Sequence, residues 1–386
     1  GASRGYRRSS PRDETRDLVH ICLNRPMPNA ISDMMAAVYL TGYGDDDKLQ
    51  YVTDAPVPTP GSDEVLIRVT AAGVNNTDIN TRIGWYAREI TTGSTDTAGA
   101  ADEQTAASGW NGDIDFPRIQ GADACGRIVD VGTNVDPARI GERVLVATLQ
   151  DAYSDTKMGC ITWGSEKDGG FAQYAVAHDT ETFAVECDWT DVELASIPCA
   201  YSTAEGMLHR VGLGAERVLI SGASGGVGSA AVQLAKRRGA EVIAVASASK
   251  AEAVRGLGAD EVIDRGADLL ERFGDNSFDV IVDVVAGPFF AQVTQLLRTG
   301  GRYITAGAIA GPIVELDVRD LYLKDLTLEG STYQDPEVFP NLVGYIERGE
   351  IRPVVAATYP LADIVEAQHA FLEKEFVGKI VLVHPE

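Results

Sequence analysis

The stretch RVLISGASGGVGSAAVQLAKRRGAEVIAVASASK, residues 217–250, decides the fold. Its first apolar run ends at Ser221, a glycine-rich turn follows, and from Val227 apolar residues recur at the spacing of one helix face. A second apolar run, EVIAVA, comes after the helix-like part. A strand, a glycine-rich turn, a helix and a second strand in this order are typical of a parallel βαβ unit that binds a dinucleotide.

The glycine-rich turn itself predicts a site for a pyrophosphate. Glycines let backbone N–H groups approach a phosphate, and the start of the helix adds its dipole and its unpaired N–H groups. The pattern is A-x-G-x-x-G, with Ala223 at a position that is often glycine, and a plain tight turn is the alternative interpretation. The predicted cofactor-binding residues of the turn are Ser224, Gly225, Gly226, Val227 and Gly228.

The end of the second strand selects the nucleotide. Sites that prefer NAD usually carry an Asp or Glu about 20 residues after the glycines, where it binds the ribose 2′-hydroxyl. This chain instead has AVASASK, in which Ser247, Ser249 and Lys250 offer two hydroxyl groups and a cation to a 2′-phosphate. These residues predict NADP(H) as the cofactor, although a helix cap followed by a solvated lysine would look the same.

Outside this unit, the spacing of apolar runs divides the chain. From about residue 195, six short apolar runs lie roughly 20 residues apart with helix-like stretches between them. Continuous apolar runs are typical of parallel strands buried on both faces, so we expect a doubly wound, Rossmann-type α/β domain over residues 195–334. Residues 35–194 instead show short β segments with Gly, Pro and Asp turns, and residues 335–386 predict two helices and a closing strand.

Composition excludes several classes of function. The 386 residues include 33 Lys and Arg against 57 Asp and Glu, so the formal charge of −24 argues against binding to nucleic acid. No apolar run approaches the ~20 residues of a membrane-spanning helix. The five cysteines are widely spaced and form no CxxC pair, which is typical of reduced thiols and predicts a cytoplasmic protein.

Two segments fit neither pattern. Residues 1–34 are rich in Arg, Ser and Asp and lack apolar periodicity, so they predict a flexible N-terminal extension. Residues 88–115 are a long stretch of Gly, Ala, Thr and Asp. A stretch of this length inside a compact domain is either disordered or a functional lid, and its composition slightly favours disorder.

Several landmarks occur together in one order, among them EVLIRVTAAGVNNTD, FPRIQGADACGRIVDVG, GGFAQYAV, VLISGASGGVGSAAVQLAK and VGKIVLV. Through them, the chain resembles the medium-chain dehydrogenase/reductase superfamily from residue 35 to residue 383, and in particular its zinc-independent quinone oxidoreductase branch. The resemblance implies a GroES-like catalytic domain over 35–194, completed by 335–386, and a Rossmann domain over 195–334. It also implies a homodimer formed by edge pairing of the nucleotide-binding sheets around residues 302–318.

The resemblance also identifies where zinc-dependent members bind their catalytic metal. Asn75 stands at the first of these positions, Ala122 at the second and Cys199 at the third, while Asp123 matches an acidic neighbour. Zinc prefers thiolate, imidazole and carboxylate ligands, and one amide, one methyl group and one thiol make a poor set. The sequence therefore predicts no metal.

By the same resemblance, further residues hold the nicotinamide end of the cofactor. One is a threonine in CAYSTAEG that packs against the ring, and the others belong to the segments VVAG and AGAIAG, which bind through backbone groups. These predicted contacts are Thr203, Val285, Ala286, Ala306, Gly307 and Ala308.

The polar stretch GVNNTD and the aromatic pair after it predict the catalytic residues. The Asn75 amide, the Thr77 hydroxyl and the Tyr86 phenol are candidate donors to the oxygen of a hydride acceptor, and Tyr86 or water is a candidate proton source. Asp78 can alternatively cap the local turn, and Tyr86 can be pocket wall together with Trp85.

These residues predict an NADPH-dependent, metal-free reductase of a small quinone or α,β-unsaturated carbonyl. Such conjugated acceptors spread the arriving negative charge, so a few oriented donors suffice without a Lewis acid. Two alternatives stay open: an NADP-dependent alcohol dehydrogenase or aldehyde reductase, and a low-turnover NADPH-binding sensor.

Overall fold

The computed structural model describes residues 31–94, 96, 109–155 and 158–386. Met34–Glu386 is one compact unit, and Gly1–Asp33 is assigned to a separate one. The predicted flexible extension therefore lies almost entirely outside the described residues, as does the centre of the predicted loop over 88–115. In the described ranges, no helix has the length and apolar character needed to cross a membrane.

The nucleotide-binding half is built on a parallel sheet. In the described part of the chain its strand order is β13-β12-β11-β14-β15-β16, and every neighbouring pair is parallel. This is the doubly wound Rossmann order, so the predicted fold class is confirmed. The strands are β11 (Arg217–Ile220), β12 (Glu241–Ala246), β13 (Glu261–Asp264), β14 (Phe278–Asp283), β15 (Leu297–Thr305) and β16 (Thr327–Gly330).

Alternate residues of these strands pack on opposite faces of the sheet. Val218 and Ile220 of β11 join the core formed with α3 and α4, whereas Leu219 joins the core formed with α6 and α7. Burial on both faces explains why the strands read as continuous apolar runs. The helices of this half are α3 (Pro198–Arg210), α4 (Gly226–Arg237), α5 (Ala251–Gly256), α6 (Leu269–Phe273), α7 (Val293–Leu296) and α8 (Val318–Leu323).

The catalytic half is a mainly antiparallel sheet that the C-terminal strands complete. Its order within the described residues is β10-β6-β5-β3-β18-β17, with β9 also paired to β3, and β18 runs antiparallel to β3. Two smaller sheets, β2-β1-β4 and β7-β8, accompany it. The strands are β1 (Met34–Leu40), β2 (Leu49–Pro56), β3 (Glu64–Gly73), β4 (Arg118–Ile119), β5 (Cys125–Val131), β6 (Arg143–Val146), β7 (Leu149–Gln150), β8 (Ile161–Thr162), β9 (Tyr174–His178), β10 (Thr182–Ala184), β17 (Val355–Pro360) and β18 (Lys379–Val383).

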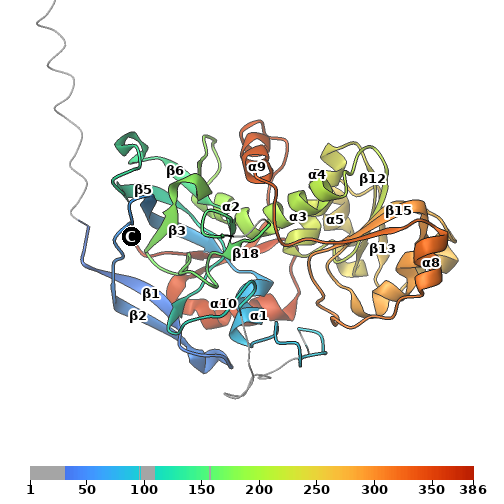
Figure 1. Cartoon of the computed structure of the whole chain (residues 1–386), viewed down its shortest axis with the longest axis horizontal. Helices are drawn as coiled ribbons and strands as arrows, with labels where there is room; N and C mark the ends of the chain where they lie inside the picture. The colour runs from blue at the N-terminus through green and yellow to red at the C-terminus, as the bar shows by residue number, and fades with distance from the viewer. Residues whose placement is uncertain (1–30, 95, 97–108, 156–157) are drawn as a thin grey trace, which may run out of the picture. The chain divides into compact units, whose positions relative to one another are not determined.

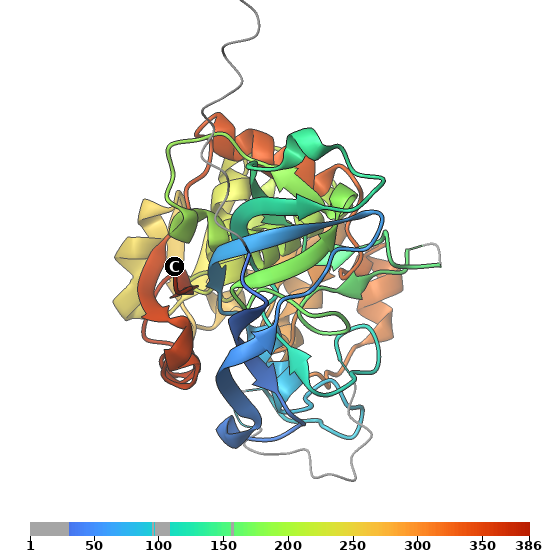
Figure 2. The same ribbon diagram turned by 90° about the vertical axis from the view of Figure 1, so that its left-hand side faces the viewer.

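This β-rich half, which faces the viewer in Figure 2, is the predicted GroES-like domain. Helices α1 (Asn76–Arg82), α2 (Asp191–Ala195) and α10 (Ile364–Glu373) pack against it, and α10 lies beside α1 in Figure 1. Arg82 of α1 donates to Gln368 of α10 over 3.1 Å, so the C-terminal helix holds α1 in place. The exact domain boundaries stay predictions, because Met34–Glu386 forms a single unit.

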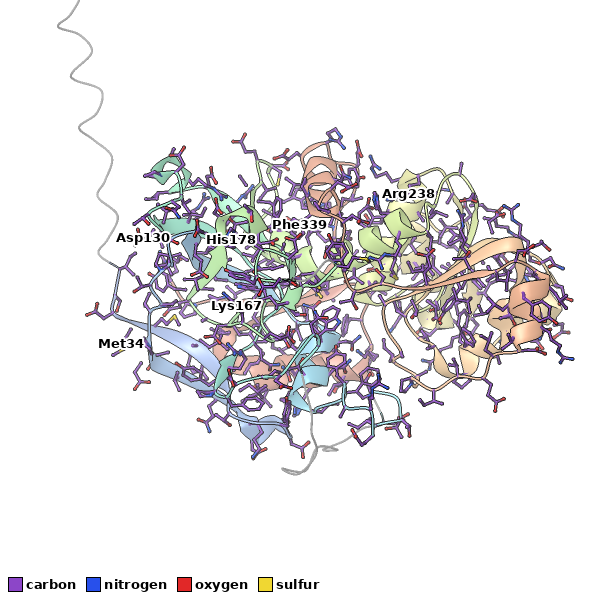
Figure 3. All side chains as sticks on the ribbon, in the orientation of Figure 1. Met34, Asp130, Lys167, His178, Arg238 and Phe339 are labelled. Carbon is purple, nitrogen blue, oxygen red and sulfur yellow. The ribbon has the colours of Figure 1, made fainter. Side chains whose placement is uncertain are left out.

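Two side-chain contacts tie helices to their neighbours, and one residue of each is labelled in Figure 3. Arg238, just after α4, donates to the buried Glu205 of α3 over 2.5 Å. Phe339 of α9 (Val338–Glu347) packs on Phe183 of β10 with ring centroids 4.7 Å apart. The Arg238–Glu205 contact holds α3, whose first turn reaches the candidate site, and the ring contact holds α9.

Candidate active site

A cavity of about 150 Å³ lies at the carboxyl ends of β11, β14 and β15, where α1 and β18 of the catalytic half meet them. This is the point at which the strand order of the parallel sheet reverses, and doubly wound folds bind their ligands there. The lining residues are Val74, Asn75, Asn76, Thr77, Asn80, Trp85, Tyr86, Trp110, Phe371 and Lys379 of the catalytic half, and Cys199, Ala200, Thr203, Gly222, Gly225, Gly226, Val227, Gly228, Val284, Ala306, Gly307, Ala308 and Ile309 of the nucleotide-binding half.

The glycine-rich turn opens the amino end of α4 towards this cavity. Gly222 has a φ of +59°, which favours glycine, and the helix begins at Gly226, one residue before the predicted start. A Cβ atom at Gly228 would lie 2.1 Å from the Gly222 carbonyl oxygen, so only glycine allows this close approach. The turn therefore fits the pyrophosphate of a nicotinamide cofactor, held by backbone N–H groups and the helix dipole.

A buried carboxylate, Asp283 at the end of β14, shapes the adjacent wall. It accepts hydrogen bonds from the backbone N–H groups of Val285 (2.8 Å) and Ala286 (3.1 Å), and from the hydroxyls of Ser221 and Tyr303. This set of bonds orders the turn in which Ala286 has a φ of +53°. Sequence reasoning missed Asp283, although an Asp at the end of an apolar strand before VVAG is a local signal.

The structure brings most of the predicted cofactor residues together. Those that line the cavity are Thr203, Gly225, Gly226, Val227, Gly228, Ala306, Gly307 and Ala308. Ser224, Val285 and Ala286 belong to the same turns but do not line it, while Ser247, Ser249 and Lys250 lie at the end of β12.

Three cations gather beyond the end of β12. Lys250 donates to the backbone carbonyl oxygen of Lys374, and burial and the nearby Arg265 lower the pKa of Lys250. Burial and Lys250 together lower the pKa of Lys374 to about 8. The Ser247 and Ser249 hydroxyl oxygens are 3.3 Å apart beside them. Because these cations repel one another, binding of an anion near them is favourable.

The floor of the cavity is a buried polar network under Asn75. The Asn75 Nδ2 atom donates to Asp123 Oδ2 (2.9 Å) and to Gly73 O (3.3 Å), and its Oδ1 atom accepts from Lys379 Nζ. Lys379 Nζ also donates to Asp123 Oδ2 (3.0 Å) and to Val74 O (3.1 Å). Sequence reasoning missed Lys379, whose only local signal is a lysine that begins an apolar strand.

Asp78 braces the start of α1 from below. Its Oδ2 atom accepts from the Asn75 N–H (2.8 Å) and its Oδ1 atom from the Ala122 N–H (3.3 Å). Burial raises the pKa of Asp78 to about 7, because these hydrogen bonds offset only part of the lost hydration. The alternative role of Asp78 as a local cap is thus the one the geometry shows.

Two hydroxyl groups reach the cavity from α1 and the turn that follows. Tyr86 Oη donates to Thr77 Oγ1 over 3.3 Å, and burial raises the pKa of Tyr86 to about 12. The phenol therefore carries its proton at neutral pH. Trp85 packs edge-on against Tyr86 with centroids 5.6 Å apart, and Trp110 stacks on it at 6.5 Å. Tyr86 is accordingly both a proton-bearing group and a wall of the cavity.

The residues at the positions that hold zinc in zinc-dependent relatives do not fit a zinc ion. Asn75 is an amide engaged by Lys379, Ala122 has no donor atom, and burial keeps the Cys199 thiol protonated by raising its pKa. Zinc needs deprotonated ligands, and the ammonium group of Lys379 bonded to Asp123 would repel it.

Comparison with known proteins agrees with this architecture. Residues 61–186 match the alcohol dehydrogenase GroES-like domain family, and residues 226–348 match the zinc-binding dehydrogenase family. A protein of known structure from Sinorhizobium meliloti 1021, provisionally classed as an alcohol dehydrogenase, is 44% identical; the match covers 92% of this chain and 98% of that one, with a TM-score of 0.84.

Two further relatives indicate the branch. The quinone oxidoreductase of Lama guanicoe is 29% identical over 91% of this chain and 98% of its own length. The 2-octenoyl-CoA carboxylase reductase CinF, solved with NADP and 2-octenoyl-CoA, is 25% identical over 92% of this chain and 89% of that one, with a TM-score of 0.77. The fold, the glycine cradle (the glycine-rich turn of residues 222–228) and the sequence matches together define an oxidoreductase of the kind that uses a nicotinamide cofactor. The chain belongs to the medium-chain dehydrogenase/reductase superfamily, in its quinone oxidoreductase-like branch.

Proposed function

We propose that the protein is an NADPH-dependent, metal-free reductase that transfers a hydride to a quinone or an α,β-unsaturated carbonyl. One observation carries this proposal: the Thr77–Tyr86 hydroxyl pair and the glycine cradle share a single cavity whose polar floor does not fit zinc. The similarity to a quinone oxidoreductase and to a 2-octenoyl-CoA carboxylase reductase supports the same class of acceptor.

In this proposal the residues of the chain bind and orient the two reactants. Bound NADPH supplies the hydride. Thr77 Oγ1 donates a hydrogen bond to the acceptor oxygen, where negative charge develops, and Tyr86 Oη, which donates to Thr77 Oγ1, holds the proton that reaches this oxygen through the threonine hydroxyl. The Trp85 and Trp110 rings exclude water and offer flat surfaces to a planar acceptor.

A direct contact between Asn75 and the acceptor stays a prediction. Its Nδ2 atom already donates to Asp123 and, at the longer distance of 3.3 Å, to Gly73 O. An acceptor oxygen can replace only the second of these bonds without breaking the network.

The experiment is steady-state NADPH oxidation with quinones, enones, enoyl thioesters and aldehydes. We expect turnover with the conjugated acceptors, and a loss of about 100-fold or more in kcat for Thr77→Val and Tyr86→Phe with an unchanged dissociation constant for NADPH. Turnover with aldehydes alone would replace this proposal by a carbonyl reductase. Tight NADPH binding without any turnover would replace it by a sensor.

The preference for NADPH over NADH rests on the cations beyond β12. Lys250 donates to Lys374 O and lies near enough to Arg265 and Lys374 for their charges to interact, and the Ser247 and Ser249 hydroxyls follow the same strand end; these groups would suit a 2′-phosphate. A charge-assisted hydrogen bond contributes about 1.5–3 kcal/mol, which corresponds to roughly 10- to 150-fold in affinity.

We therefore expect Lys250→Ala to weaken NADPH binding by that factor and to leave NADH binding unchanged. The matched control is Lys48→Ala, which removes a lysine of the catalytic half that does not line the cavity. Fluorescence titration with both nucleotides measures the effect. Equal losses for the two nucleotides would contradict the assignment of the 2′-phosphate site.

The proposed assembly is a homodimer formed through the edge of the nucleotide-binding sheet. β16 is the last strand in the sheet order, and large apolar side chains are exposed just before it: Ile313, Val318, Tyr322 and Leu323. We expect a dimer in light scattering and a monomer for Leu323→Glu. Ile140→Glu, an exposed isoleucine of the catalytic half, is the control that keeps the dimer.

The proposed location is the cytoplasm. The four cysteines of the described residues (Cys125, Cys160, Cys187 and Cys199) are free thiols, as the cysteine spacing predicts for a reducing compartment. Fractionation of the source cells followed by immunodetection tests this location.

A further inference from the structure

Lys379 is the only residue with a formal charge among the described residues that line the cavity. It is the first residue of β18, its side chain is buried, and its stem packs near Gly226 of the cradle. Its three ammonium hydrogens are directed to Val74 O, Asn75 Oδ1 and Asp123 Oδ2. An ammonium group in this position acts through its charge, because no proton is left to donate to a ligand.

The Lys379–Asp123 pair is oriented with its positive end towards the cavity. Asp123 is fully buried, does not line the cavity, and its Oδ1 atom accepts from the Cys199 N–H over 2.6 Å. Lys379 lines the cavity and its Nζ atom lies 3.0 Å from Asp123 Oδ2, so the lysine is the cavity end of the pair. A fixed dipole in a site with little water stabilises negative charge that develops at its positive end.

The same ammonium group also polarises the Asn75 amide. A hydrogen bond from Lys379 Nζ to Asn75 Oδ1 draws electron density from the amide nitrogen, which makes Nδ2–H a stronger donor. It also fixes which end of the amide faces which neighbour, since Oδ1 must face Lys379 and Nδ2 must face Asp123.

We propose that Lys379 is the fixed cation of this active site, taking the electrostatic role that a metal ion has in zinc-dependent relatives. This inference rests on the proposed function, because the charge that Lys379 stabilises is that of the reduced acceptor. As the hydride adds to the conjugated carbon, the displaced electron pair moves to the acceptor oxygen. That oxygen lies above Asn75, where the ammonium charge lowers the energy of the transition state.

A purely structural role, in which Lys379 only neutralises Asp123, predicts a different result for paired substitutions. Asp123→Asn removes the carboxylate charge and keeps an oxygen that can accept from the Cys199 N–H. Lys379→Met in that background then removes the cation, keeps the apolar stem against Gly226 and leaves no unpaired buried charge. If Lys379 only balances Asp123, the single variant D123N holds an unpaired buried cation, so the double variant is at least as active as D123N.

The test measures kcat for the single variant D123N and the double variant D123N/K379M with a series of acceptors of decreasing electron affinity. We expect the double variant to lose about 10-fold against D123N with a strongly oxidising quinone and about 100- to 1000-fold with a weakly activated enone. A weaker acceptor places more charge on its oxygen in the transition state and so depends more on the cation. Lys379→Gln in the same background is the second variant if the urea midpoint of D123N/K379M falls.

The outcomes separate this inference from the proposed function. A D123N/K379M variant at least as active as D123N, or a loss that is the same for every acceptor, overturns the role of Lys379 alone. Absence of wild-type turnover with all conjugated acceptors overturns the proposed function as well. Zinc analysis is the readout that does not depend on turnover: we expect less than about one-tenth equivalent of zinc in wild type, and a full equivalent would overturn the assignment of Lys379 as the cation.

Discussion

The carboxyl group of Asp78 makes the stability of this protein depend on pH. Its side chain is buried at 1% exposure, and burial raises its pKa from 3.8 to about 7 against the opposing effect of the Asn75 N–H. A rise of about 3 pKa units corresponds to roughly 4 kcal/mol of free energy between the two protonation states. The group is fully enclosed, so solvent does not screen this effect away.

The sign of the effect follows from which state keeps the proton. Below about pH 4, Asp78 is protonated in the folded and the unfolded chain, so it does not lower the free energy of unfolding. Between about pH 4 and pH 7 the folded chain keeps the proton that the unfolded chain releases, so the free energy of unfolding falls as pH rises. The Asp78→Asn variant lacks this titration. We therefore expect the difference in free energy of unfolding, variant minus wild type, to rise by up to about 4 kcal/mol from pH 4 to pH 7.5.

Urea unfolding at a series of pH values measures this difference. Ile79→Val is the matched control, because it lies on the same helix, is buried and does not titrate; it lowers stability by about 0.5–1.5 kcal/mol equally at every pH. Parallel curves for Asp78→Asn and wild type over this range would refute the reasoning, and so would a difference that falls with pH.

Three further variants or reagents probe other parts of the site. Gly228→Ala places a Cβ atom 2.1 Å from Gly222 O, and we expect the overpacked cradle to weaken NADPH binding by roughly 5- to 150-fold in a fluorescence titration. Tyr303→Phe deprives the buried Asp283 of a 2.8 Å hydrogen bond, and we expect urea unfolding to show a loss of about 1–3 kcal/mol. Burial raises the pKa of Cys199, so we expect mass spectrometry to find it unlabelled by iodoacetamide at pH 8 until the chain unfolds.

The fold could be predicted because its signals are local. The apolar runs that became β11, β12 and β14 are continuous because both faces of each strand are buried, and the glycines of the turn between β11 and α4 are required by contacts within a few residues. The predicted helix start differs from the observed one by a single residue, Gly226, since glycines carry little information about where helical hydrogen bonding begins.

The floor of the site could be predicted only in part, because its partners are distant in sequence. The Asn75, Thr77 and Tyr86 group lies within one short segment, and all three line the cavity as expected. Asp123 and Lys379 are separated by 256 positions, and only the pairing of β18 with β3 brings the lysine under Asn75. No period or motif in a single sequence encodes such a pairing, so the proposed role of Lys379 could not be predicted from the sequence.

The two halves of the protein are joined by polar contacts at the candidate active site. Cofactor binding and the arrangement of the floor residues therefore depend on each other. Asp123 of the catalytic half accepts from the Cys199 N–H at the start of α3, and α3 is held to α4 by the Arg238–Glu205 pair. Lys379 lies against Gly226 from the other side. Any displacement of α4 when the glycine-rich turn binds the cofactor would therefore reach the floor through α3 and through Lys379 together. Substitutions in either set of contacts are expected to change KM for the cofactor and kcat together, whereas Thr77 and Tyr86, which belong to neither set, change kcat alone.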